Sequence, residues 1–71
     1  MNQTNNVNEN TLQYPLKEWL DPTELENEFH FSRSTQAKMR MNSLIPYHKI
    51  GKYVRYKRSE INKWLDAAKV V

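Results

Sequence analysis

The fold is decided by the stretch KIGKYVRYKRSEINKWL at residues 49–65. Two runs of strand-forming residues flank Gly51-Lys52, and glycine supplies the positive φ that a tight hairpin turn needs. After the hairpin, apolar residues recur at i, i+3, i+4 and i+7, the pattern of one helix face. They are Ile61, Trp64, Leu65 and Ala68. The stretch therefore predicts two short strands, followed at once by a helix whose apolar side packs on the core.

Side chains alternate between the two faces of a strand, so the hairpin divides into an apolar side and a cationic side. The apolar side is predicted to close the core with Ile50, Val54 and Tyr56. The opposite side is predicted to carry Lys49, Tyr53, Arg55 and Lys57. The hairpin is thus expected to be amphipathic, with a positive face toward solvent.

Two short helices are predicted before the hairpin. The first spans about residues 22–29 and begins with the capping box of Asp21 and Glu24. The second spans residues 33–41 and begins at Ser32, a good N-cap. The join between the first helix and that cap is so short that the helices must cross steeply, as in a helix-turn-helix.

Length and composition limit the classes of protein to consider. The chain has 71 residues and no cysteine, which predicts one domain with a thin core and excludes disulfides and thiolate metal sites. Residues 1–14 are Asn-rich and are expected to form a disordered tail, which places the domain at 15–71. There is no apolar run long enough to span a membrane and no signal peptide, so the expected location is cytoplasmic.

Catalytic and metal-binding patterns are missing from the sequence. It has no Ser/His/Asp or Cys/His set, no Gly-rich phosphate loop and no carboxylate cluster in its basic half. The two histidines, His30 and His48, have no co-ligand pattern for a metal. We therefore expect neither an enzyme nor a bound metal or cofactor.

Charge is distributed unevenly along the chain. Residues 1–28 contain one lysine against six carboxylates, whereas residues 29–71 contain ten lysines and arginines against two carboxylates. A positive C-terminal part of this kind suits a polyanion, with nucleic acid first and an anionic membrane surface second. A solvated surface on an ordinary small domain would also account for it.

The predicted order is helix, tight turn, helix, two-stranded wing, helix, which is mostly α with a small β-hairpin, a winged helix-turn-helix. Several segments match one family pattern without a gap: Trp19-Leu20, Phe31-Ser32, SRST at 32–35, Ile45-Pro46, Lys49-Ile50-Gly51, Val54-Arg55-Tyr56, Arg58-Ser59-Glu60-Ile61 and Trp64-Leu65. On these segments the chain from residue 19 to residue 65 resembles the excisionase-like, AlpA-type winged helix-turn-helix domains, relatives of the MerR DNA-binding domain.

The chain departs from that pattern in three places. Leu25-Glu26 stands where the family usually has alanine, and His30 stands where it usually has the glycine of the turn. Gln36 and Arg40 stand where apolar residues are common. The last departure leaves two buried faces open for the second helix, one with Met39 and one with Met41.

The resemblance implies that the second helix enters the major groove of DNA. Its N-terminal half would then offer Arg33, Ser34, Thr35, Gln36 and Lys38, with Arg33 for a guanine and Gln36 for an adenine. Ser32 at the helix start would suit a phosphate. The wing would contact the backbone or the minor groove through Lys49, Lys52, Tyr53 and Arg55.

The expected function is therefore sequence-specific binding and bending of double-stranded DNA. The resemblance allows two roles, an excision factor that works with an integrase (a recombination directionality factor) or a transcription regulator of a prophage or mobile element. An alternative from another class is a protein-interaction module without DNA affinity. MerR-like relatives often dimerise through a long C-terminal helix that this chain lacks, so we expect a monomer in solution that associates on DNA.

Overall fold

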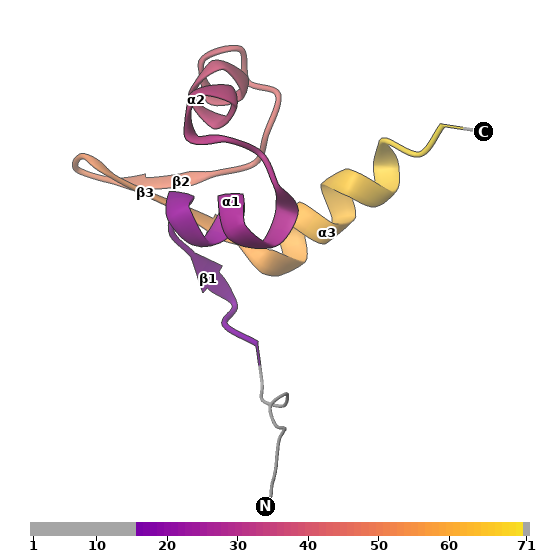
Figure 1. The fold of residues 1–71 in the computed structure, drawn as a ribbon, viewed down its shortest axis with the longest axis horizontal. Helices are drawn as coiled ribbons and strands as arrows, with labels where there is room; N and C mark the ends of the chain where they lie inside the picture. Colours follow the sequence, from indigo (N-terminus) through magenta and orange to yellow (C-terminus); the bar gives the residue numbers. More distant parts are fainter. Residues whose placement is uncertain (1–15, 71) are drawn as a thin grey trace, which may run out of the picture.

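The computed structural model describes residues 16–70, and Figure 1 shows their arrangement. Three helices and a three-stranded antiparallel sheet form this part of the chain. In order, they are β1 (Trp19–Leu20), α1 (Pro22–Phe29), α2 (Arg33–Met41), β2 (His48–Ile50), β3 (Tyr53–Lys57) and α3 (Arg58–Ala67). The tail predicted at residues 1–14 lies outside the described residues. Within residues 16–70, none of the helices is long and apolar enough to cross a membrane.

The starts of α1 and α2 follow the capping residues that the sequence predicts. Asp21 accepts a hydrogen bond from the backbone N–H of Glu24 (2.8 Å), and the Glu24 carboxylate accepts one from the N–H of Asp21 (2.9 Å). Ser32 accepts from the N–H of Thr35 (3.2 Å). Between the helices, His30 ends α1 in the left-handed region, with φ 64°. This residue sharply turns the chain, at a steric cost that glycine would avoid.

The sheet has one strand more than the sequence analysis predicts. Its strand order is β1-β3-β2, and the short strand β1 pairs with β3 through Trp19↔Lys57 and Leu20↔Tyr56. A strand of two residues is too short to show an alternating pattern, so its sequence carries no strand signal. The predicted hairpin of β2 and β3 is present, and Gly51 adopts the expected positive φ of 58°. Figure 1 shows the hairpin extending beyond the helices on the side away from α3.

The prediction of the hairpin faces is wrong for two residues of β2. Ile50 pairs with Tyr53, and Lys49 pairs with Val54. Paired residues of an antiparallel ladder lie on the same face. A two-residue turn therefore puts Ile50 beside Tyr53, where Ile50 is 79% exposed, and it puts Lys49 on the side of Val54.

The strand pairs define two faces that we name here. The inner face of the sheet carries Leu20, Lys49, Val54 and Tyr56. The outer face carries Trp19, His48, Ile50, Tyr53, Arg55 and Lys57. The fully or nearly fully buried core lies on the inner side and consists of Leu20, Leu25, Ile45, Tyr56 and Ile61.

The packing of α2 and α3 settles the alternatives left open by the sequence. Met39 packs against the core, whereas Met41 is 82% exposed, so α2 buries the face that contains Met39. On α3, Trp64 packs partly against the core and lies near Phe31, with ring centroids 5.8 Å apart. Leu65 is exposed, which contradicts its predicted place in the apolar stripe. Ala68, also predicted there, lies beyond the end of α3 and is exposed.

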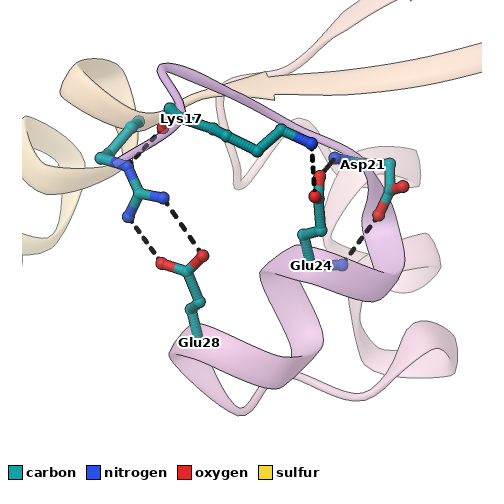
Figure 2. A network of polar contacts seen from close by, with 5 residues as sticks. Lys17, Asp21, Glu24 and Glu28 are labelled. Carbon is teal, nitrogen blue, oxygen red and sulfur yellow. Dashed lines mark hydrogen bonds and ion pairs between the residues drawn. The ribbon is translucent and has the colours of Figure 1, made fainter. Parts of the chain in front are cut away.

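A network of charged groups joins the chain before β1 to α1 and α3, as Figure 2 shows. Lys17 pairs with Glu24 at 2.6 Å, next to the capping box of α1. Arg58 donates through both terminal nitrogens to Glu28, at 2.6 and 3.1 Å, and through Nε to the backbone carbonyl of Lys17 (2.6 Å). The network fixes α1 against the first turn of α3 from outside the core.

Candidate nucleic-acid interface

The N-terminal turn of α2 is held by hydroxyl groups. Besides capping the helix, the Ser32 hydroxyl donates to Thr35 Oγ1 (2.9 Å) and lies 3.2 Å from the Ser34 hydroxyl. All three side chains belong to exposed residues. Ser32 and Thr35 therefore fix the helix start, and the hydroxyls remain at a surface where a ligand can approach.

Gln36 is not at that surface, which contradicts the expectation that its side chain is offered to an adenine. It is fully buried. Its amide nitrogen donates to the backbone carbonyls of Pro22 and Phe31, both at 2.9 Å. Its amide oxygen accepts from the Tyr56 hydroxyl at 3.0 Å. With both N–H groups and the oxygen engaged, Gln36 fills the space between α1, α2 and the sheet, and it satisfies polar groups that burial would otherwise strand.

Arg40 extends this buried network toward the surface. Its guanidinium donates to the Tyr56 hydroxyl and lies 5.9 Å from the ring centroid of Tyr47. Burial of the Tyr56 phenol raises its pKa, although the Arg40 cation acts in the opposite direction. The phenol thus stays neutral and can donate to Gln36. Sequence reasoning missed this contact, and the signal available for it was the presence of two polar residues at positions 36 and 40 where the resembled family has apolar ones.

The exposed side of α2 is opposite Gln36. Ser34 and Lys38 lie one turn apart there and are both exposed. Arg33 is also exposed, and its guanidinium donates to the Thr23 hydroxyl of α1 at 3.1 Å, which holds it at the α1–α2 join. The structure therefore leaves Arg33, Ser34 and Lys38 of the predicted set exposed, with Ser34 and Lys38 on the outer row of α2 and Arg33 beside it at the α1–α2 join; we call these three residues the ridge of α2.

The four predicted wing residues are divided between the two faces of the hairpin. Lys52 lies in the turn. Lys49 lies on the inner face, the side on which Tyr56 meets α2. Tyr53 and Arg55 lie on the outer face, where the Arg55 guanidinium is 5.8 Å and the Lys52 ammonium 5.7 Å from the Tyr53 ring centroid. The ridge of α2 and the side chains of Tyr53 and Arg55 thus lie on opposite sides of the sheet.

Comparison with known proteins found no relative of this chain. No protein-family model matches this chain, and neither the curated proteins nor the solved structures include a match. In the described part of the chain, no three His, Asp or Glu side chains lie close enough together to hold a metal ion.

Proposed function

We propose that this protein is a winged helix-turn-helix that binds double-stranded DNA, with α2 in the major groove and the β2–β3 hairpin as the wing. The observation that carries the proposal is the charge of this surface. Eight lysines and arginines and no carboxylate occur between residues 29 and 59, a span that contains α2 and the whole hairpin. Arg58 among them is paired with Glu28, and the other cations attract the phosphate backbone, which supplies a large share of the affinity of such proteins.

The ridge of α2 supplies the groups for the major groove. Lys38 and Ser34 face outward from the helix, and an α-helix fits the width of that groove. Arg33 is placed at the first turn, from which a guanidinium can fork onto guanine O6 and N7. On the hairpin, Lys49 lies on the inner face, the same side of the sheet as α2, and Lys52 lies in the turn. Both lysines would contact phosphates. Gln36 has no part in this contact because it is buried.

The biological role that this activity suits best is that of a small excision factor of a phage or mobile element, which bends attachment-site DNA for an integrase in a bacterial cytoplasm. A transcription regulator that uses the same surface is the second candidate. The two differ in what they do to DNA. Resonance energy transfer between the labelled ends of a bound duplex would rise strongly on bending, which favours the excision factor, and would stay unchanged for a regulator that leaves its operator straight.

The binding proposal is tested by fluorescence anisotropy of a labelled mixed-sequence duplex at several salt concentrations. Wild-type protein should bind with an affinity that falls steeply with salt, and Lys38→Gln and Lys52→Gln should each lower the slope by about 0.9, the value for one phosphate contact. The matched control is Lys63→Gln, which removes the same charge from an exposed position of α3. Absence of binding at low salt, or equal losses in all three variants, would contradict the proposed surface and favour a protein-interaction module.

The role of Arg33 is tested separately by sequence preference. Arg33→Ala should weaken the preferred site more than unrelated duplexes, because a bidentate contact to a guanine discriminates by about 1–3 kcal/mol. Selection of sites from a random pool with wild-type protein and with the variant measures this directly. An unchanged preference would assign Arg33 to the α1–α2 join, through its bond with Thr23.

A further inference from the structure

The outer face of the sheet is a second cationic surface, on the side away from α2. Two aromatic rings lie on it at either end of β3, since Tyr53 begins the strand and Trp19 pairs with Lys57 at its end. Tyr53 is 57% exposed and Trp19 is 45% exposed. With about 3.4 Å per residue, the two strand positions that carry the rings are about 14 Å apart. No residue of the outer face belongs to the buried core.

Cations are interleaved with these rings. Lys57 lies 5.8 Å from the Trp19 ring centroid, and Lys52 and Arg55 lie 5.7 and 5.8 Å from that of Tyr53. Each ring thus has at least one positive charge beside it. The cation–π contacts hold the charged ends close to the ring faces, where they can meet the phosphates on either side of a stacked base.

A hollow of about 440 Å³ is lined by Trp19, His48, Ile50 and Arg55 of this face and by Lys49, which belongs to the inner face. The Trp19 and His48 rings meet edge to face, with centroids 5.0 Å apart, and the exposed Ile50 side chain lies outside the core. The hollow is therefore lined by aromatic and apolar side chains together with Arg55 and Lys49, and the nearby carboxylate of Glu60 is paired with His48 at 2.8 Å.

We propose that the outer face of the sheet binds single-stranded nucleic acid. Bases stack on Tyr53 and in the hollow beside Trp19, and Arg55 and Lys57 pair with the intervening phosphates. An aromatic platform inside a cationic groove is the general arrangement for strands whose bases are unpaired. A duplex cannot use the two rings in this way because its bases are stacked on each other. The site is separate from the ridge of α2, so the inference does not depend on the proposed duplex binding.

An acidic peptide is the other occupant that the charge would suit, but the sheet favours it less. A peptide that adds to a sheet gains most of its affinity from main-chain hydrogen bonds along an exposed edge. The free edge strands here have two and three residues, β1 and β2. They are too short for a long ladder, whereas the rings and cations occupy the flat face itself.

The test uses the full chain and a fluorescein-labelled oligothymidylate of about 12 nucleotides, which forms no duplex. An oligouridylate of the same length is the second probe, and the tighter of the two identifies DNA or RNA as the source. Tyr53→Ala should weaken binding about 10-fold, as the loss of one stacked base does. Arg55→Gln should weaken binding and lower the salt slope by about 0.7, the value for one phosphate contact on a single strand. Lys63→Gln on α3 is the charge-matched control and should leave the affinity within twofold. Circular dichroism melts confirm that the variants are folded.

A second measurement reports the stacking itself. In Trp64→Phe the only tryptophan is Trp19, and its fluorescence should be quenched as the oligomer binds. Four outcomes would overturn the proposal: failure to bind either probe at low salt, equal binding by Tyr53→Ala and wild type, binding without quenching, and displacement by an acidic peptide in preference to unlabelled oligomer. If duplex binding persists in these cases, only the assignment of the outer face fails.

Discussion

Each face of the sheet carries one tyrosine of β3, and the two faces use it differently. On the inner face, Tyr56 is fully buried, and its hydroxyl accepts from Arg40 and donates to Gln36. On the outer face, Tyr53 of the same strand is 57% exposed, with the side chains of Lys52 and Arg55 beside its ring. Each tyrosine thus has a cation close by, yet one tyrosine holds the fold and the other remains available. Their surroundings decide between the two roles.

The difference also explains how so small a core accommodates polar groups. Five apolar or aromatic residues form the core, and one glutamine is buried with them. A buried polar network rigidifies a fold only when every member has a partner. Gln36 meets this condition through two carbonyls and one hydroxyl. Its function is to join α1, α2 and the sheet, so the helix proposed to enter DNA is set firmly on the inner face.

The largest expected effect comes from truncating the two tyrosines. Tyr56→Ala should lower the free energy of unfolding by about 3–5 kcal/mol, the cost of removing a buried aromatic side chain. Tyr53→Ala should change it by less than about 0.5 kcal/mol because the side chain is largely in solvent. Urea denaturation followed by circular dichroism measures both. Equal destabilisation by the two variants would contradict the division into a structural and an available face.

A smaller effect is expected from Gln36, and it tests whether the network or the volume matters. Gln36→Leu introduces an apolar side chain of similar size but removes the donor to two backbone carbonyls and the acceptor of the Tyr56 hydroxyl. Burying such groups unpaired should cost about 1–3 kcal/mol. Denaturation of the single variant beside Tyr56→Phe and the double variant forms a thermodynamic cycle. Strict additivity would show that the hydroxyl and the amide do not act together.

Sequence reasoning predicted the elements that have local signals. The caps at Asp21 and Ser32, the hairpin at Gly51 and the helix after it each depend on neighbours within a few residues, and the structure confirms all of them. Strand β1 has no such signal, since a two-residue strand exists only through its partner β3.

The wrong predictions for Ile50 and Gln36 have another cause, since the positions of both side chains depend on the fold. Simple alternation predicts Ile50 on the apolar face, but the length of the turn makes it the partner of Tyr53 and so places it on the outer face. The family resemblance implies that Gln36 faces DNA, but a polar side chain can be buried when distant backbone carbonyls lie within reach. Those carbonyls belong to residues 5 and 14 positions away, and only the fold brings them together. The candidate site was thus predictable in its charge but not in how its two sides divide.

The join that sets α2 on the inner face offers a gain in stability. His30 adopts a left-handed conformation that costs a residue with a Cβ about 1–2 kcal/mol. His30→Gly should therefore raise the free energy of unfolding by up to about 1 kcal/mol, after the larger entropy of glycine in the unfolded chain is subtracted. His30→Ala is the control, since it removes the imidazole and keeps the strain, and it should give no gain. A gain from alanine would place the cost in the imidazole.

The smallest effect should appear at acid pH and come from outside the core. The hydrogen bond from Arg58 lowers the pKa of Glu28, and the hydrogen bond from Lys17 lowers that of Glu24, both from an ordinary value of 4.5. Since the carboxylates titrate lower in the folded protein, their contribution is complete above the unfolded value. It is lost as the pH falls from about 5 through the folded values.

For Glu28, which is 40% exposed, that contribution should be less than about 1 kcal/mol. Glu28→Gln should flatten the dependence of the unfolding free energy on pH below about 5. Glu26→Gln is the control. Glu26 lies on the same helix as Glu28, and none of the described residues forms an ion pair with it. The buried network should contribute nothing in this range, since the raised pKa of Tyr56 keeps its phenol neutral. An acid transition that survives both Glu28→Gln and a matching Glu24→Gln would mean that another carboxylate stabilises the fold.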